Sequence, residues 1–155
     1  MQQAGLLPQG FKLPKINHQT LLSFDFGLRW IGTAVGQTLT ATATPQASLQ
    51  ARDGIPRWQD IEKLVTTWQP NAFVVGLPLN MDGSISEMSH RARKFGNRLH
   101  GRFGLPVHFV DERLSSFEAR GDIIAETGSR DFKNQAIDSR CAALLLESWL
   151  RETTE

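Results

Sequence analysis

The sequence predicts an α/β fold in which a mixed sheet carries helices on both faces. Three strand-like segments with short links follow one another in the first third of the chain, which is typical of an antiparallel meander. After them, segments with helical spacing of apolar residues alternate with short apolar runs typical of buried strands. This order of elements favours a sheet with antiparallel and parallel parts and a helical layer on each side.

The meander is predicted from strands at 20–26, 30–36 and 42–49, of which the third has the weakest pattern. Side chains of the first strand alternate between the two faces of the sheet, so they fall into two sets. One face carries Leu22, Phe24 and Phe26, and the other carries Leu21, Ser23 and Asp25.

The remaining elements alternate along the second part of the chain. Helices are predicted at 57–68, 85–102, from Ser115 or Ser116 to about residue 127, and at 136–151. Strands are predicted at 72–75 and 107–110, and a polar loop at 129–135. We expect the two late strands to run parallel to each other and to the first strand, since each follows a helix.

Length and composition fit one domain. The chain has 155 residues, of which 40% are hydrophobic, and this suits a single core at 20–152 behind a flexible tail at 1–19. With 17 basic and 16 acidic residues, the net charge of +1 argues neither for nor against a nucleic-acid partner.

No apolar run approaches the ~20 residues of a membrane helix, and no signal-peptide pattern is present. We therefore expect a cytoplasmic protein with no membrane partner, and the lone Cys141 in its core.

Acidic residues follow two of the predicted strands. Asp25 lies at the carboxyl end of the first strand, and Asp111 and Glu112 lie at the end of the strand at 107–110. If these strands are parallel, their carboxyl ends meet at one edge of the sheet, where the sites of α/β proteins gather.

A third acidic residue, Asp138, lies on the apolar side of the last predicted helix. At about 100° per residue, several core residues fall within about 60° of it; they are Cys141, Ala142, Leu145 and Trp149. The small side chains of Ala142 and Ala143 would let this helix approach the sheet closely.

Asp25, Glu112 and Asp138 together predict a site for Mg²⁺ or Mn²⁺, because hard cations prefer carboxylate oxygens. Two such ions ~4 Å apart can stabilise the attacking and leaving oxygens of phosphodiester hydrolysis. Each acid also has a structural alternative. Asp25 can form a turn or pair with Arg29, and Glu112 can pair with Arg113. Asp138 can cap its own helix.

Four segments of the chain resemble the YqgF family of bacterial RNase H-like proteins. They are residues 25–36 (DFGLRWIGTAVG), 75–83 (VGLPLNMDG), 110–119 (VDERLSSFEA) and 137–146 (IDSRCAALLL). They occur in the family's order, and the segment Asp-Glu-Arg-Leu-Ser beside the loop Gly-Leu-Pro-Leu-Asn is the specific part. The resemblance does not cover residues 1–19.

The resemblance implies an RNase H-like fold with a five-stranded mixed sheet. It also implies that Asp25, Glu112 and Asp138 are the catalytic acids and metal ligands. The implied activity is a nuclease that processes the 5′ end of precursor 16S ribosomal RNA in ribosome biogenesis.

Basic and polar residues near these acids are candidate substrate contacts. Arg29 and Arg113 stand close in sequence to the proposed ligands and can neutralise a phosphate, or only balance the acids. Asn80 lies in the loop at 76–83, whose glycines allow close approach of a phosphate or merely shape the turn. Ser115 can bind substrate, with helix capping as the alternative.

The predicted helix at 85–102 presents a basic ridge. Arg91, Lys94, Arg98 and Arg102 fall within an ~80° arc of it. Such ridges hold phosphate backbones without sequence preference, and an ordinary solvated helix face is the alternative.

Two other functions fit the same fold. One is a Holliday-junction-type resolvase of branched DNA, and the other is a non-catalytic factor that binds ribosomal RNA. The resemblance favours a nuclease whose partner is the ribosomal RNA precursor, with ribosomal assembly intermediates as further candidate partners. No dimer surface is evident in the sequence, and a monomer or a weak homodimer is expected.

Overall fold

The computed structural model describes residues 18–111 and 134–153. Six strands form one mixed sheet in these ranges. They are β1 (Thr20–Asp25), β2 (Trp30–Gln37), β3 (Thr42–Arg52), β4 (Ile55–Pro56), β5 (Ala72–Leu77) and β6 (Val107–Asp111). Their order across the sheet is β4-β3-β2-β1-β5-β6. Strands β1 to β4 pair antiparallel, whereas β5 pairs parallel to β1 and β6 parallel to β5, which confirms the predicted mixed sheet.

The sheet has one strand more than the five that were expected. β3 runs on to Arg52, and a two-residue turn leads into β4, where Ile55 pairs with Arg52. The turn residues Asp53 and Gly54 have φ angles of 52° and 80°, as a tight hairpin turn requires. The Asp-Gly pair is a sequence signal for such a hairpin, but a strand of two residues shows no alternation that a pattern could detect.

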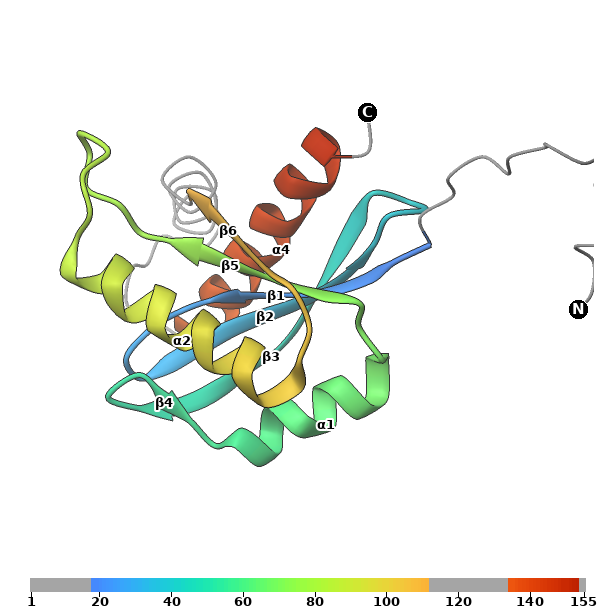
Figure 1. The fold of residues 1–155 in the computed structure, drawn as a ribbon, viewed down its shortest axis with the longest axis horizontal. Coiled ribbons are helices and arrows are strands. Elements are labelled where there is room, and N and C mark those ends of the chain that lie inside the picture. The colour runs from blue at the N-terminus through green and yellow to red at the C-terminus, as the bar shows by residue number, and fades with distance from the viewer. Residues whose placement is uncertain (1–17, 112–133, 154–155) are drawn as a thin grey trace, which may run out of the picture.

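Helices cover both faces of the sheet, as predicted. α1 (Trp58–Trp68) and α2 (Glu87–Phe103) lie on one face, and α4 (Asn134–Thr153) crosses the other (Figure 1). The helix predicted between residues 115 and 127 lies outside the described residues, as does the predicted tail up to residue 17. Within the described ranges, no helix has both the length and the apolarity to cross a membrane.

The two faces have cores of different character. The core under α1 and α2 is aromatic, and the rings of Phe24 and Phe95 meet edge to face at 5.5 Å. The core under α4 is aliphatic and includes Leu21, Val74 and Leu145. This division follows the predicted alternation of β1, whose odd residues face α4 and whose even residues face the other helices.

α4 approaches the sheet closely because β2 presents small residues to it. Ala34 packs against Ala142 and Ala143, which confirms the expectation drawn from those two alanines. A Cβ atom on Gly36 would lie 2.8 Å from Leu146 Cδ2. Dispersion contacts at this short range add to the burial of aliphatic side chains and hold the helix against the sheet.

The tightest contact is between Gly32 of β2 and the backbone of α4. A Cβ atom on Gly32 would overlap the carbonyl group of Asp138 and lie 2.6 Å from the nitrogen of Ser139. Both obstacles are backbone atoms, so they cannot move aside as a flexible side chain would. Gly32 therefore sets how closely α4 can lie on β2.

We expect Gly32→Ala to destabilise the fold by about 1–3 kcal/mol, because the added methyl group pushes α4 away from β2. The matched control is Gly101→Ala in α2, where an added Cβ meets nothing within 4 Å. That change should stabilise the protein by about 0.5–1 kcal/mol through helix propensity. Urea unfolding of both variants measures the difference. Unaltered stability of Gly32→Ala would contradict the close packing.

Candidate active site

Asp25 is the last residue of β1 and lies almost fully buried, with 2% of its surface exposed. It belongs to the face of β1 that is turned toward α4. Two residues earlier on this face, the buried Ser23 donates a hydrogen bond of 2.7 Å from Oγ to the carbonyl oxygen of Ala142. The polar set that the sequence predicted on β1 therefore faces α4.

Asp138 lies in the first part of α4, at the point where the helix meets the end of β1. Asp25 pairs with Gly32 across the β1–β2 ladder, and Gly32 in turn lies against the backbone of Asp138. Asp25 and Asp138 are 113 positions apart in the sequence, and both adjoin Gly32 in the fold. Asp138 is half-buried, which agrees with its expected place on the apolar stripe of the helix.

Ser139 fastens this part of α4 to the sheet. Its side chain is buried, and its Oγ accepts a hydrogen bond of 3.2 Å from the backbone nitrogen of Thr33. It also lies 2.8 Å from Ser48 Oγ on β3, with either hydroxyl as donor. The pairing of β2 with β3 shifts register between Ile31 and Thr33. The hydroxyl of Ser139 therefore joins α4, β2 and β3 beside Asp138.

The sequence did not single out Ser139. The signal that it offered was a serine next to Asp138 in a largely apolar helix. Its two partners belong to strands more than 90 residues away, and no local pattern indicates such contacts.

The carboxyl ends of β1, β5 and β6 meet at one edge of the sheet. Phe24 pairs with Val75, and Leu77 pairs with Asp111, all in parallel register. Asp111 is exposed, whereas Val110 packs on the α4 side of the sheet. The expectation that these strand ends share an edge is confirmed.

Three predicted site residues, Glu112, Arg113 and Ser115, lie outside the described residues. Among residues 18–111 and 134–153, no three His, Cys, Asp or Glu side chains gather closely enough to hold a metal ion. Asp25 and Asp138 are the members of the predicted triad that this part of the chain contains.

Arg29 is exposed in the connection between β1 and β2. Its carbonyl oxygen accepts a hydrogen bond of 2.8 Å from the nitrogen of Ala51, and its side chain lines a pocket with Arg52 and Asp53. The structure thus places Arg29 beside the β3–β4 hairpin.

Asn80 lies in the loop between β5 and α2, where its amide Nδ2 donates to Ser84 Oγ at 3.0 Å. The backbone nitrogen and hydroxyl of Ser84 also donate to Asp82 Oδ1. At the base of the loop, Ser86 Oγ donates to the carbonyl oxygen of Pro78. The hydrogen bond of Asn80 therefore helps to fix the conformation of this loop.

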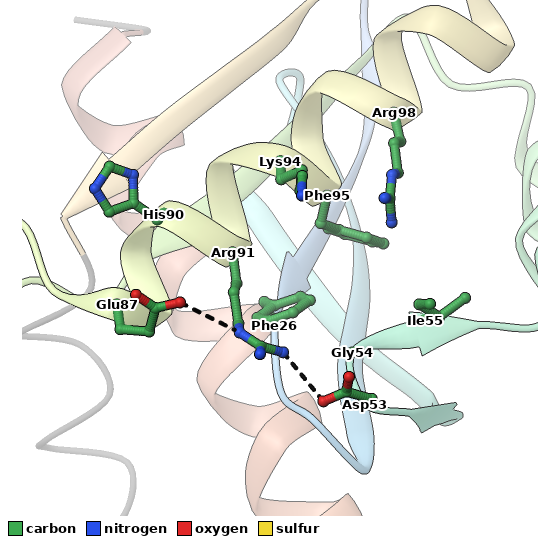
Figure 2. Close-up of a pocket in the computed structure, with 10 residues that line it drawn as sticks. All are labelled: Phe26, Asp53, Gly54, Ile55, Glu87, His90, Arg91, Lys94, Phe95 and Arg98. Atoms are coloured by element: carbon green, nitrogen blue, oxygen red, sulfur yellow. Dashed lines mark hydrogen bonds and ion pairs between the residues drawn. The ribbon is translucent and has the colours of Figure 1, made fainter.

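The basic ridge predicted on α2 divides into two groups. Arg91, Lys94 and Arg98 line a cleft between α2 and the β3–β4 hairpin, which Figure 2 shows. Arg102 instead lies over the ring of Trp58 of α1, 4.2 Å from its centroid. The ridge is therefore partly an open surface and partly a packing contact between helices.

Comparison with known proteins places these features in context. A family model described as "RuvX: Holliday junction resolvase" matches residues 19–152. A protein of Marinobacter nauticus named "Putative pre-16S rRNA nuclease" is 55% identical over 140 residues, which are 90% of this chain and 98% of the relative. A protein of Azotobacter vinelandii with the same name is 56% identical and covers 85% of this chain and 93% of its own length.

Solved structures with the same fold share little sequence. Fowlpox virus resolvase with Holliday junction DNA has a TM-score of 0.54 at 13% identity, covering 88% of this chain and 99% of its own. T. thermophilus RuvC with a Holliday junction substrate has a TM-score of 0.51 at 14% identity, covering 88% and 98%. At this identity the likeness concerns the fold alone, and it confirms the RNase H-like architecture.

Replacing Ser139 with alanine should cost about 1–3 kcal/mol of stability, since the buried nitrogen of Thr33 loses its acceptor. Ser84→Ala serves as the control, because its hydroxyl lies in an exposed loop, and we expect a change within about 0.5 kcal/mol. Thermal or urea unfolding gives both values. Equal effects of the two substitutions would show that Ser139 does not anchor α4.

Proposed function

The chain belongs to the RuvX family, and from this premise we propose that it is a divalent-metal-dependent nuclease that processes the 5′ end of precursor 16S ribosomal RNA. The family match and the names of its relatives support a hydrolase of phosphodiester bonds. With this substrate the protein would act in the cytoplasm, with ribosomal assembly intermediates as further partners. A monomer or a weak homodimer remains our expectation.

The meeting of Asp25 and Asp138 across Gly32 carries the proposal. The buried position of Asp25, at the end of an otherwise apolar strand, supports a role beyond solubility. A carboxylate in such surroundings is costly unless it is paired or binds a cation.

The residues at this edge fit a hard divalent cation. Asp25 and Asp138, with Glu112, would offer carboxylate oxygens, which are the ligands that Mg²⁺ and Mn²⁺ prefer. When bound, the metal would supply charge stabilisation for the attacking and leaving oxygens of a phosphodiester.

The chain itself contributes the fixed positions of Asp25 and Asp138. Asp25 is held by the β1–β2 ladder, and the helix turn that carries Asp138 is held by Ser139. Preorganised groups need no rearrangement during the reaction, which lowers its barrier. The close packing of α4 on β2 therefore serves the proposed chemistry directly.

Cations and polar groups around this edge are proposed to bind the phosphates of the substrate. Proposed contacts outside α2 are Arg29, Arg113, Asn80 and Ser115, and proposed contacts on α2 are Lys94 and Arg98. The sequence also predicts Arg91 as a substrate contact. Its ion pairs with Asp53 and Glu87 favour a structural role for this side chain.

A second candidate substrate is branched DNA, which the description of the family model favours. The same metal-assisted hydrolysis would serve both substrates. A non-catalytic factor that binds ribosomal RNA is the third alternative. Substrate choice therefore has to be measured with both nucleic acids.

Asp138→Asn should abolish cleavage of a precursor ribosomal RNA leader in Mg²⁺ or Mn²⁺. The expected loss exceeds the about 10–100-fold that results when a residue merely orients a metal ligand. Glu62→Gln, on the exposed side of α1, is the control and should cleave at the wild-type rate. Gel analysis of labelled RNA, with a four-way DNA junction in parallel, measures the rates.

Preferential cleavage of the junction would favour the resolvase. RNA binding without cleavage by the wild type would favour the non-catalytic factor. Wild-type activity of a folded Asp138→Asn variant would remove Asp138 from the proposed site.

Direct metal binding is a separate prediction. Calorimetric titration with Mn²⁺ or Mg²⁺ should give a binding heat for the wild type and for Glu62→Gln, and none for Asp25→Asn, which removes one anionic ligand. Pretreatment with a chelator should precede each titration. A wild-type titration with no heat above background would count against the metal site, whatever the result of the cleavage assay.

A further inference from the structure

A cleft of about 460 Å³ lies between α2 and the β3–β4 hairpin. Its volume falls within the about 300–1,000 Å³ of small-ligand sites. One of its lining residues, Phe26, directly follows Asp25 in the sequence. Since Phe26 packs toward α2 and Asp25 lies toward α4, the cleft and the candidate active site occupy opposite faces of one sheet edge.

An ion pair links the hairpin side of the cleft to α2. Arg91 Nη1 lies 3.1 Å from Asp53 Oδ1, and Arg91 Nε lies 3.7 Å from Glu87 Oε2. Figure 2 shows the Arg91 side chain extended between the two carboxylates. The first contact links α2 to the hairpin, the second lies within α2, and together the two carboxylates neutralise Arg91.

Two further cations of α2 line the cleft. Lys94 and Arg98 are exposed, lie one helical turn apart, and form no ion pair within the described ranges. With three cations and two carboxylates in its lining, the cleft has a net formal charge of +1, and Lys94 and Arg98 lie together on one helix face, where they suit a phosphate.

Apolar groups lie directly beside these charges. Phe26 and Phe95 form the buried base of the cleft, with ring centroids 5.6 Å apart. Ile55, which follows the hairpin turn, is 51% exposed at its rim. In Figure 2 the Arg98 side chain extends toward the segment that carries Ile55. The cleft therefore combines cations with an accessible apolar group.

We propose that this cleft binds an unpaired nucleotide of the RNA strand that flanks the cleavage position. The phosphate would lie on Lys94 and Arg98, and the base or sugar would lie against Ile55 and the edge of Phe26. A duplex fits less well, because its bases are stacked inside and its outer surface offers mainly phosphates and hydroxyl groups. Unstacked bases, by contrast, enter concave sites with apolar walls.

The inference rests on the proposed nuclease function, since it assigns the flanking strand to a substrate of that site. It adds a preference for single-stranded RNA next to the cut. The tight Asp53–Gly54 turn supports it, because a Cβ on Gly54 would lie 2.7 Å from the Phe26 ring. The glycine thus lets the hairpin close over the base of the cleft while Ile55 stays at its rim.

The test measures binding rather than cleavage. In the Asp25→Asn background, fluorescence anisotropy compares a short single-stranded oligoribonucleotide with the blunt duplex of the same sequence. Lys94→Ala with Arg98→Ala should weaken single-strand binding about tenfold or more. The dependence of log affinity on log salt should fall by about 0.7 for each lost phosphate contact. Ile55→Ser, which changes no charge, should weaken single-strand binding several-fold and leave duplex binding unaltered.

Lys63→Ala, an exposed cation of α1 outside the cleft, is the control and should alter neither affinity. The side chains of Ile55, Lys63, Lys94 and Arg98 are exposed, so the fold should persist in these variants relative to the shared Asp25→Asn background. Equal losses for duplex and single strand, or no effect of Ile55→Ser, would overturn the proposal. If the wild type cleaves neither nucleic acid while these selective losses are found, the proposed nuclease function is rejected. The cleft is then kept as a binding site for single-stranded RNA.

Discussion

The contact between Gly32 and the backbone of α4 is the constraint on which the candidate site depends. Gly32 pairs with Asp25 in the sheet and lies against Asp138 in the helix. A side chain at this position would separate the two acids by lifting the helix from the strand. Close packing in protein interiors is intolerant of even one added methyl group. The geometry of the acids is therefore a consequence of backbone packing more than of their own side chains.

The two faces of the sheet differ in the side chains that they bury. The face under α1 and α2 buries aromatic rings, including Phe24, Phe73 and Phe95, and supplies most of the large apolar side chains. The face under α4 accommodates buried hydroxyl groups, and Ser23 and Ser139 both have hydrogen-bond partners there. Satisfied polar groups are tolerated in a core, and they fix one arrangement of the helix over the strands.

Family membership and geometry support the nuclease in different ways. The similarity extends over 98% and 93% of the length of these two relatives. The more distant structures share the fold at 13–14% identity, which shows that the sheet and its helices tolerate almost complete change of sequence. What such folds do is decided by residues at the sheet edge. Here that edge carries Asp25 and Asp138, and the α2 cleft opens beside it.

The sequence by itself determined the type and order of most elements, the alternation of β1 and the apolar stripe of α4, and it supplied the acids of the proposed site. These are local patterns, set by the periods of strands and helices and by the chemistry of single residues. Tertiary structure decided the short strand β4, the anchoring of α4 by Ser139, and the ion pair of Arg91 with the hairpin. Each of these depends on partners 38 to 106 positions away or on a strand of two residues. Such contacts form only when the chain has folded, because packing brings together groups that no local period relates.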